Sequence, residues 1–297
     1  MELDGGLKTD RIMLEVALAL LPAIAASVLV FGPWVLTGLL TAIIGCLVAE
    51  AVFFQSVRIL QDYSALVTGL LIALALPPTT PIYISVLAAV CAIGLGKKSF
   101  GGLGKNIFNP AMVGYAIVLV SFPFDIGAWD ATTGATSLDK ISHRFGATLQ
   151  EIESDPAFGS FGAAGFEWVN VFAGAGGLFL IYRKIIGWRL PMATLIGLCL
   201  PAVLAYDGGS SASFGSPLMH CFSGGTMLAA FFIVTDPVTS PSSVRGQWLF
   251  GLIVGALIFV IRAWGSYPDG IAFSVLLANA LVPLLDQKHS NKTVSGR

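Results

Sequence analysis

Residues 65–81 read ALVTGLLIALALPPTTP, and this uncharged run closed by prolines indicates the fold class. A helix over its apolar part rises about 1.5 Å per residue and suits a bilayer better than a water-facing surface. Proline then ends the helix. Residues 225–241 read GTMLAAFFIVTDPVTSP, and a shift of 160 positions (237 − 77) aligns the P-x-T-x-P of 77–81 with that of 237–241. The chain therefore holds two similar apolar segments that close in the same way.

The composition around these segments excludes a soluble globular protein. The chain has 297 residues, of which 56% are hydrophobic and 11% are charged. Soluble domains carry about 25% charged residues, so this chain has too few to cover a water-facing surface. Its net charge of −1 gives no basic footprint for nucleic acid. We expect a multi-pass protein of the lipid bilayer, without a cleavable signal peptide, because its first apolar run is followed at once by another.

Ten apolar runs separated by polar turns predict an all-α integral membrane protein with about ten transmembrane helices. Several runs hold only 15 or 16 residues, about 24 Å of helix against a hydrocarbon core of about 30 Å. Short runs interrupted by Gly or Pro favour broken helices that line a site. The ten runs are 12–31, 35–55, 63–77, 82–96, 107–122, 167–182, 190–205, 217–235, 245–262 and 269–285.

The basic residues orient these helices. An even number of spans places both termini on one side, and if that side is the cytoplasm, all but three of the 16 basic residues lie inside. This bias is what the positive-inside rule requires. Lys97, Lys98 and Lys105 count among the inside residues, as cations of a Gly-rich turn. The three outside residues are Lys140, Arg144 and Arg262.

The same topology predicts one membrane domain, 1–297, made of two halves. Residues 1–122 form the first five-helix half, 167–297 form the second, and 123–166 form an external loop between them. The two proline-closed segments end the third span of each half, on opposite sides of the membrane because five is odd. The arrangement predicts a 5+5 inverted repeat.

The external loop contains the motif DATTGAT, residues 130–136. It matches the pattern D-x-x-[ST]-x-A-T, on which a flavin transferase attaches FMN to the last Thr through a phosphoester. Thr136 is then the FMN carrier, and Asp130, Thr133, Gly134 and Ala135 complete the motif. Gly134 and Ala135 leave the Thr136 hydroxyl open. The alternative interpretation is a plain loop, for which Ser, Thr, Gly and Asp are typical.

Other candidate chemistry in the sequence is weak. Ser223–Thr226 reads SGGT, but His220 stands where the motif needs Asp, so we do not expect flavin on Thr226. The four cysteines are interpreted as small apolar residues, with cluster ligation or a disulfide as alternatives. The scattered histidines show no metal-ligand spacing. We therefore predict no metal site and no catalytic residue in the isolated chain.

Several blocks, taken together and in order, resemble one known family. DYSALVTGLLIALALPP (62–78), GGLGKNIFNPAMVGY (101–115), DATTGAT (130–136), GGTMLAAFFIVTDPVTSP (224–241) and YPDGIAFSVLLANALVPLLD (267–286) resemble the D subunit of the Rnf ion-translocating electron-transport complex. They are similar, more distantly, to the B subunit of the Na⁺-translocating NADH:quinone reductase. Thr133 stands where Ser is common, and it keeps the hydroxyl.

The resemblance implies a ten-span subunit of the bacterial inner membrane with covalent FMN on Thr136, facing the periplasm. It implies partner subunits that together pass electrons between ferredoxin and NAD and move Na⁺ or H⁺, a translocase-type oxidoreductase. It further implies an exported flavin transferase for maturation and a second, noncovalent flavin such as riboflavin.

Two other functions stay open on the sequence alone. The inverted repeat and the short, broken helices are also typical of a channel or secondary transporter without a redox role. A structural scaffold for partner subunits is the third interpretation. A covalent flavin on Thr136 would distinguish the electron-transport subunit from both the transporter and the scaffold.

Overall fold

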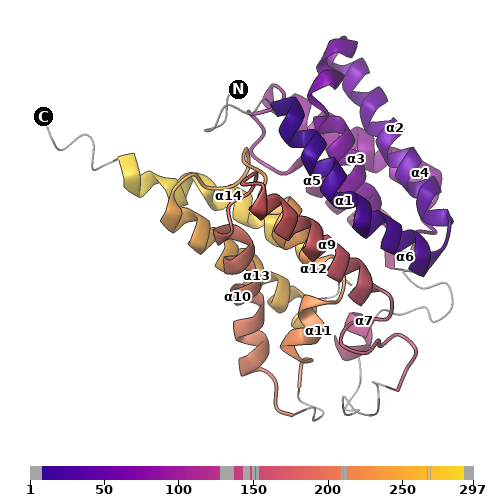
Figure 1. Ribbon diagram of the computed structural model, residues 1–297, viewed down its shortest axis with the longest axis vertical. Helices are drawn as coiled ribbons and strands as arrows, with labels where there is room; N and C mark the ends of the chain where they lie inside the picture. The colour runs from indigo at the N-terminus through magenta and orange to yellow at the C-terminus, as the bar shows by residue number, and fades with distance from the viewer. Residues whose placement is uncertain are drawn as a thin grey trace, which may run out of the picture.

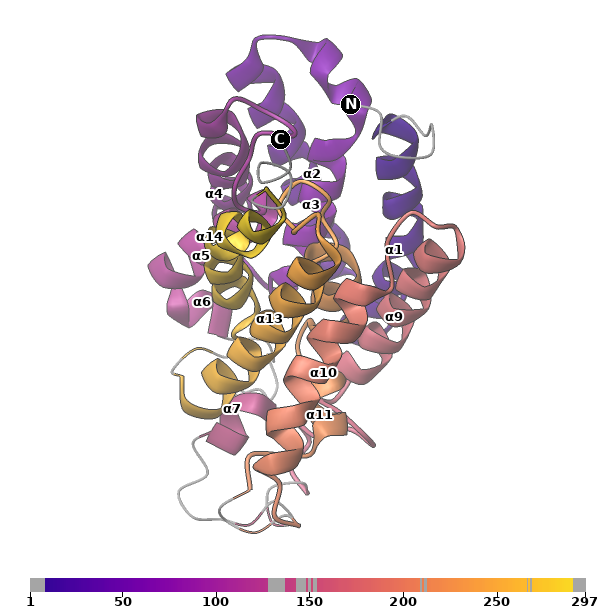
Figure 2. The same cartoon turned by 90° about the vertical axis from the view of Figure 1, so that its left-hand side faces the viewer.

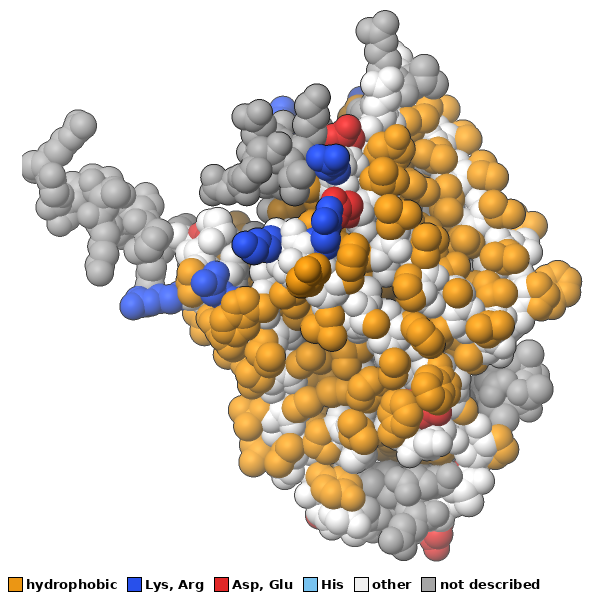
Figure 3. Space-filling view, in the orientation of Figure 1, with side chains coloured by type: hydrophobic (Ala, Val, Ile, Leu, Met, Phe, Trp, Pro, Cys, Tyr) orange, Lys and Arg blue, Asp and Glu red, His pale blue; other side chains and the backbone are white. Residues whose placement is uncertain are grey.

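The computed structural model describes residues 9–127, 137–142, 148, 151, 154–208, 210, 213–265, 267 and 269–290. Within these ranges the secondary structure is helical, apart from one β-bridge between Phe158 and Ala163 (Figure 1). The predicted all-α class is therefore confirmed for this part of the chain. Mean hydropathy is +0.84, and hydrophobic side chains cover much of the face in Figure 3, with most visible Lys and Arg gathered at its upper left.

The helices form two groups that are successive in the chain (Figures 1 and 2). The first group contains α1 (Thr9–Phe31), α2 (Trp34–Phe54), η1 (Val57–Asp62), α3 (Ser64–Ala75), α4 (Ile82–Cys91), η2 (Ala92–Lys97), η3 (Lys98–Phe100) and α5 (Pro110–Ser121). The second contains α9 (Phe166–Tyr182), α10 (Arg189–Leu204), α11 (Pro217–Cys221), α12 (Thr226–Leu228), η4 (Ala229–Ile233), α13 (Val244–Trp264) and α14 (Ile271–Ser290). Between the groups lie α6 (Pro123–Gly127) and α7 (Ser137–Ser142).

Four helical segments of the described chain are long and apolar enough to cross a membrane. They are Thr9–Phe31, Trp34–Phe54, Ile82–Phe100 and Val244–Trp264. Five more apolar helices are shorter: Ser64–Ala75, Pro110–Ser121, Phe166–Tyr182, Arg189–Leu204 and Ile271–Asp286. These nine segments correspond to nine of the ten predicted runs.

The remaining run, 217–235, is broken into α11, α12 and η4. The break falls at 222–225, where Gly224 takes a positive φ of 56° that other residues rarely adopt. Both η2 and η4 are π-helical turns, which occur mostly as local bulges in α-helices and often at functional sites. The expectation of interrupted helices is thus confirmed for this segment.

The two groups pack in similar ways. In the first, α2 contacts α3 and α4, and α4 contacts α5; in the second, α10 contacts η4 and α13, and α13 contacts α14. Small residues allow these approaches. A Cβ on Gly255 of α13 would lie 2.1 Å from the Thr194 carbonyl oxygen of α10.

Contacts between the groups come from α1 with α9 and from α5 with α14. A Cβ on Gly176 would lie 2.1 Å from the Ala19 carbonyl oxygen, so only glycine lets α9 approach α1 this closely. At the start of α5, the Asn109 N–H donates to Asn279 Oδ1 at 3.1 Å, and Asn279 Nδ2 donates to the Thr239 carbonyl at 2.9 Å. These bonds join the start of α5, where Asn109 caps the helix, to the second group.

Two of the cations counted for the orientation are buried in the structure. Lys97 was expected in an inside turn, but it ends η2 and is 1% exposed. It lies inside the helix group because the helical run continues past residue 96. Arg262, expected outside, is likewise 3% exposed and lies within α13.

Candidate functional site

The proposed flavin motif lies outside the described residues. This holds for Asp130, Thr133, Gly134, Ala135 and Thr136. The structure resumes at the next residue, Ser137, which begins α7 and is 1% exposed. The Ser137 hydroxyl is buried and has no hydrogen-bond partner among the described residues. Such an atom costs about 1–3 kcal/mol and is rare in proteins, so it marks a place where another polar group fits.

Ser137 and Leu138 line a groove between the two helix groups. The free space of the groove, with its open mouth included, is about 1180 Å³. Pockets for small molecules are mostly apolar, with a few polar groups. The groove has this character, because α1, α3, α5 and α9 give it mainly apolar walls. Its polar side chains are Ser27, Tyr115, Ser137, Asn170 and Asp269.

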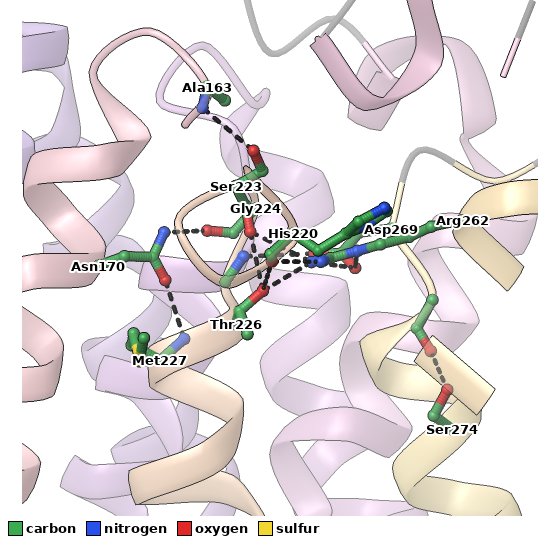
Figure 4. A network of polar contacts seen from close by, with 12 residues as sticks. Ala163, Asn170, His220, Ser223, Gly224, Thr226, Met227, Arg262, Asp269 and Ser274 are labelled. Carbon is green, nitrogen blue, oxygen red and sulfur yellow. Dashed lines mark hydrogen bonds and ion pairs between the residues drawn. The ribbon is translucent and has the colours of Figure 1, made fainter. Parts of the chain in front are cut away.

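Arg262 holds Asp269 in place on the wall of the groove (Figure 4). Arg262 Nε donates to Asp269 Oδ1 at 3.1 Å, and the Gly225 N–H donates to Oδ2 at 3.3 Å. Gly224 passes so close that a Cβ there would lie 2.3 Å from Oδ2. The carboxylate is therefore fixed from three sides, and its side chain remains 18% exposed.

The rest of the Arg262 guanidinium binds the turn between α11 and α12. Nη1 donates to the His220 carbonyl at 2.8 Å, and Nη2 donates to the Ser223 carbonyl at 3.2 Å and to the Thr226 hydroxyl at 3.0 Å. The Thr226 hydroxyl donates back to these carbonyls. Thr226 is 0% exposed, which agrees with our expectation that it carries no flavin.

Asn170 of α9 links this turn to the opposite wall (Figure 4). Its Nδ2 donates to the Gly224 carbonyl at 2.7 Å, and its Oδ1 accepts from the Met227 N–H at 2.8 Å. Asn170 is 2% exposed. Both ends of its amide are used, so its role is to position the Gly224 turn and α12.

The segment that leads from the loop into α9 is anchored to the same turn. Glu167 Oε2 accepts from the N–H groups of Phe161 and Gly162 at 3.1 and 3.2 Å. The Ala163 N–H donates to Ser223 Oγ at 3.1 Å, and the rings of Phe161 and Phe222 stack edge to face at 5.1 Å. The end of the predicted flavin loop therefore has a fixed position beside the groove.

Two polar contacts order described parts of the loop. Lys140 of α7 donates to Asp155 Oδ1 at 2.5 Å. The Thr148 N–H and hydroxyl both donate to Glu151 Oε2, at 2.7 and 2.9 Å, and these bonds hold the pKa of the Glu151 carboxyl below its usual value. Glu151 is an exposed anion of the loop.

A second cavity, with about 880 Å³ of free space when its open mouth is included, lies between the start of α3 and the end of η4. Asn106 on its wall is 4% exposed, and its Oδ1 has no hydrogen-bond partner in the described ranges. Asp236, also on the wall, accepts from the Val238 N–H at 3.1 Å and the Thr239 hydroxyl at 3.0 Å. These bonds identify Asp236 as a turn residue at the end of the helix.

A buried ion pair adjoins the second cavity. Lys97 Nζ donates to Glu50 Oε1 and to Ser64 Oγ. Ser64 in turn donates to Asp62 Oδ1 from its N–H at 2.8 Å and from its hydroxyl at 2.6 Å. Glu50 is 0% exposed, and its Oε2 has no hydrogen-bond partner in the part of the chain that the structure describes. The first helix group thus buries one cation and one anion together.

Comparison with known proteins decides the family. Residues 3–295 match the model of the family described as "NQR2, RnfD, RnfE family". The chain belongs to this family. It is 43% identical to the D subunit of the ion-translocating oxidoreductase complex of Ectopseudomonas mendocina (strain ymp), over 95% of this chain and 90% of that protein. The D subunits of the same complex from Cellvibrio japonicus (strain Ueda107) and Pseudomonas aeruginosa (strain UCBPP-PA14) are 41% and 42% identical, over 98% and 99% of this chain and 92% and 94% of theirs.

The family resemblance seen in the sequence is therefore confirmed. The structure adds buried ionic contacts that the sequence blocks did not single out. The sequence did not reveal that Lys97, counted only for the orientation, pairs with Glu50. It also missed the pairing of Arg262 with Asp269. The usable signal was the rarity of ionisable residues within membrane segments, where they are usually paired.

Proposed function

We propose that this chain is a membrane subunit of an ion-translocating oxidoreductase complex and carries FMN as a phosphoester on Thr136. The relatives that span nearly its whole length are named as the D subunit of such a complex. The observation that carries the flavin part is the position of Ser137. This buried residue, whose hydroxyl has no partner among the described residues, lines the groove one residue after Thr136.

The attachment step is a phosphoryl transfer by a separate exported enzyme. The Thr136 hydroxyl forms a bond to the FMN phosphorus of FAD, the pyrophosphate bond breaks, and AMP leaves. Asp130, Thr133, Gly134 and Ala135 form the motif that the transferase recognises. The attached flavin would supply one- and two-electron transfer, and the protein supplies position and electrostatics.

The residues of the groove suit a flavin ring. Its apolar walls accept a flat aromatic system, and the Ser137 hydroxyl and the Asp269 carboxylate offer hydrogen bonds at its edge. Arg262 keeps Asp269 oriented toward the groove, because its Nε donates to one carboxylate oxygen and leaves the side chain partly exposed. The tether limits the ring to a short arc beside this groove.

The topology that goes with this function has ten membrane spans, both termini in the cytoplasm of a bacterium, and the 123–166 loop on the external face of the inner membrane. The broken 217–235 segment is the eighth of these spans. Residues 1–122 and 167–297 are the halves of an inverted repeat, a proposal supported by the similar packing of the two helix groups. Partner subunits pass electrons to and from the tethered flavin.

A second, noncovalent flavin such as riboflavin fits the cavity beside α3 and η4. Asn106 Oδ1, which lacks a partner within the described ranges, offers an acceptor for a ring N–H. Replacing Asn106 by Ala should lower the amount of flavin that is released by denaturation, while covalent flavin stays constant.

The direct test of the redox function is flavin fluorescence of the chain on a denaturing gel after co-expression with the transferase. The wild-type band should fluoresce, Thr136→Ala should be dark, and Thr133→Ser should fluoresce because it keeps the motif. A dark wild-type band would contradict the proposal.

A secondary transporter is the second candidate, because a helix broken at 222–225 is typical of transporter binding sites. Solute uptake by the transporter would survive Thr136→Ala. Electron transfer through the complex would not.

A further inference from the structure

Two cysteines from different helices contact each other. Cys199 of α10 and Cys221, the last residue of α11, have their Sγ atoms 3.3 Å apart. Both residues are half-buried. Among the other cysteines, Cys46 of α2 is 0% exposed and Cys91 lies in α4. The contact bears on the disulfide that the sequence left open as an alternative to plain apolar residues.

The helix α11, which ends at Cys221, lies near the end of the molecule that carries α7 (Figure 2). Cys199 is five residues before the end of α10 at Leu204 (204 − 199 = 5), about 7.5 Å along the helix. Cys221 immediately precedes Phe222 and Ser223, which hold the end of the loop through Phe161 and Ala163. The sulfur contact thus joins α10 to the turn that surrounds Arg262.

We propose that Cys199 and Cys221 form a disulfide in the mature protein. The step follows thiol–disulfide exchange with an exported protein disulfide while the chain folds in the membrane. One thiolate attacks that disulfide and gives a mixed disulfide, and the second thiolate displaces the oxidant. Two electrons pass to the oxidant, which leaves as a dithiol, and the cysteine thiols give up two protons.

The geometry needs little change for this bond. A disulfide is about 2.03–2.05 Å long, so the sulfur atoms must approach by about 1.3 Å. The oxidising compartment is the external one, and for its location the inference rests on the orientation given under Proposed function. The bond stabilises the fold by restricting the unfolded chain and fixes α11, whose His220 carbonyl binds Arg262.

A thiol count in the full chain tests the bond. Cells are quenched in acid, and free thiols are tagged with a maleimide, in one sample directly and in another after reduction. The mass of the chain then gives the number of tags. Two tags before reduction and four after it are expected. Cys199→Ser should carry three tags in both cases. Four tags on the wild-type chain before reduction would overturn the proposal.

A second measurement tests the effect of the bond on stability. Dithiothreitol should lower the thermal unfolding midpoint of the purified wild-type chain and leave that of the Cys199→Ser/Cys221→Ser variant unchanged. An equal response of both proteins would overturn the proposal.

The orientation has its own control. A Tyr206→Cys variant without other cysteines should react with a membrane-impermeant maleimide on intact cells. If the disulfide forms but this variant is not labelled, the proposed topology is contradicted, whereas the disulfide itself is still supported.

Discussion

Each helix group buries a cation, Lys97 in the first and Arg262 in the second, and the two cations serve different purposes. In the first group, Lys97 binds Glu50 of α2 and the hydroxyl of Ser64 at the start of α3. In the second, Arg262 binds Asp269 and the turn that leads into α12. Both cations therefore lie beside the start of a helix, α3 in the first group and α12 in the second.

The difference lies in how completely the partners are satisfied. The planar guanidinium of Arg262 divides its donors among a carboxylate, two carbonyls and a hydroxyl, as the fork geometry of arginine allows. Lys97 is a point charge with two acceptors, and one oxygen of its partner Glu50 has no hydrogen-bond partner in the described chain. We infer that the Arg262 cluster positions a turn, whereas the Lys97 cluster mainly neutralises a buried acid.

The largest effect is expected from breaking the tighter ion pair. Lys97→Met leaves Glu50 charged and unpaired at 0% exposure, and loss of one partner of such a pair costs about 3–5 kcal/mol. A large fall in the unfolding midpoint of the purified chain should follow. Lys97→Met with Glu50→Leu should recover most of it, because both charges are gone. A single variant as stable as wild type would contradict the neutralising role.

A smaller effect is expected from replacing the forked guanidinium of Arg262. Arg262→Lys keeps the charge next to Asp269 but cannot reach all four partners, so carbonyls of the α11–α12 turn lose donors. The expected loss is about 1–3 kcal/mol, measured by thermal unfolding, with a larger loss for Arg262→Met. An Arg262→Lys variant with the unfolding midpoint of the wild type would show that the turn does not depend on the guanidinium geometry.

The smallest effect is expected at one backbone position, Gly224, which packs against Asp269. Gly224→Ala places a Cβ 2.3 Å from Asp269 Oδ2 at a φ of 56°, and a left-handed conformation alone costs about 1–2 kcal/mol in a residue with a Cβ. Gly225→Ala is the matched control, because its Cβ would meet Ile271 at 3.5 Å, an ordinary contact. Hydrogen exchange should rise in the turn only for the first variant. Equal exchange in both would contradict the close fit.

The sequence predicted the regular helices well and the polar clusters poorly. The expected runs 167–182 and 190–205 became Phe166–Tyr182 and Arg189–Leu204, because charged residues bound an apolar run sharply. The break at 222–225 was harder to locate, since Phe222 and the small residues after it fit a continuous apolar run. Lys97 was placed in a turn because the orientation rule counts charges and does not see their partners. Those partners come from Glu50 and Ser64, which are distant in sequence.

Mass spectrometry can detect the proposed covalent flavin on Thr136 and locate it on the chain. The chain is co-expressed with the transferase and digested, and the peptides of residues 123–166 are sequenced by mass spectrometry. We expect an added mass equal to one FMN less one water, located on Thr136 and lost in Thr136→Ala. An unmodified Thr136, or the same mass on another residue, would contradict it.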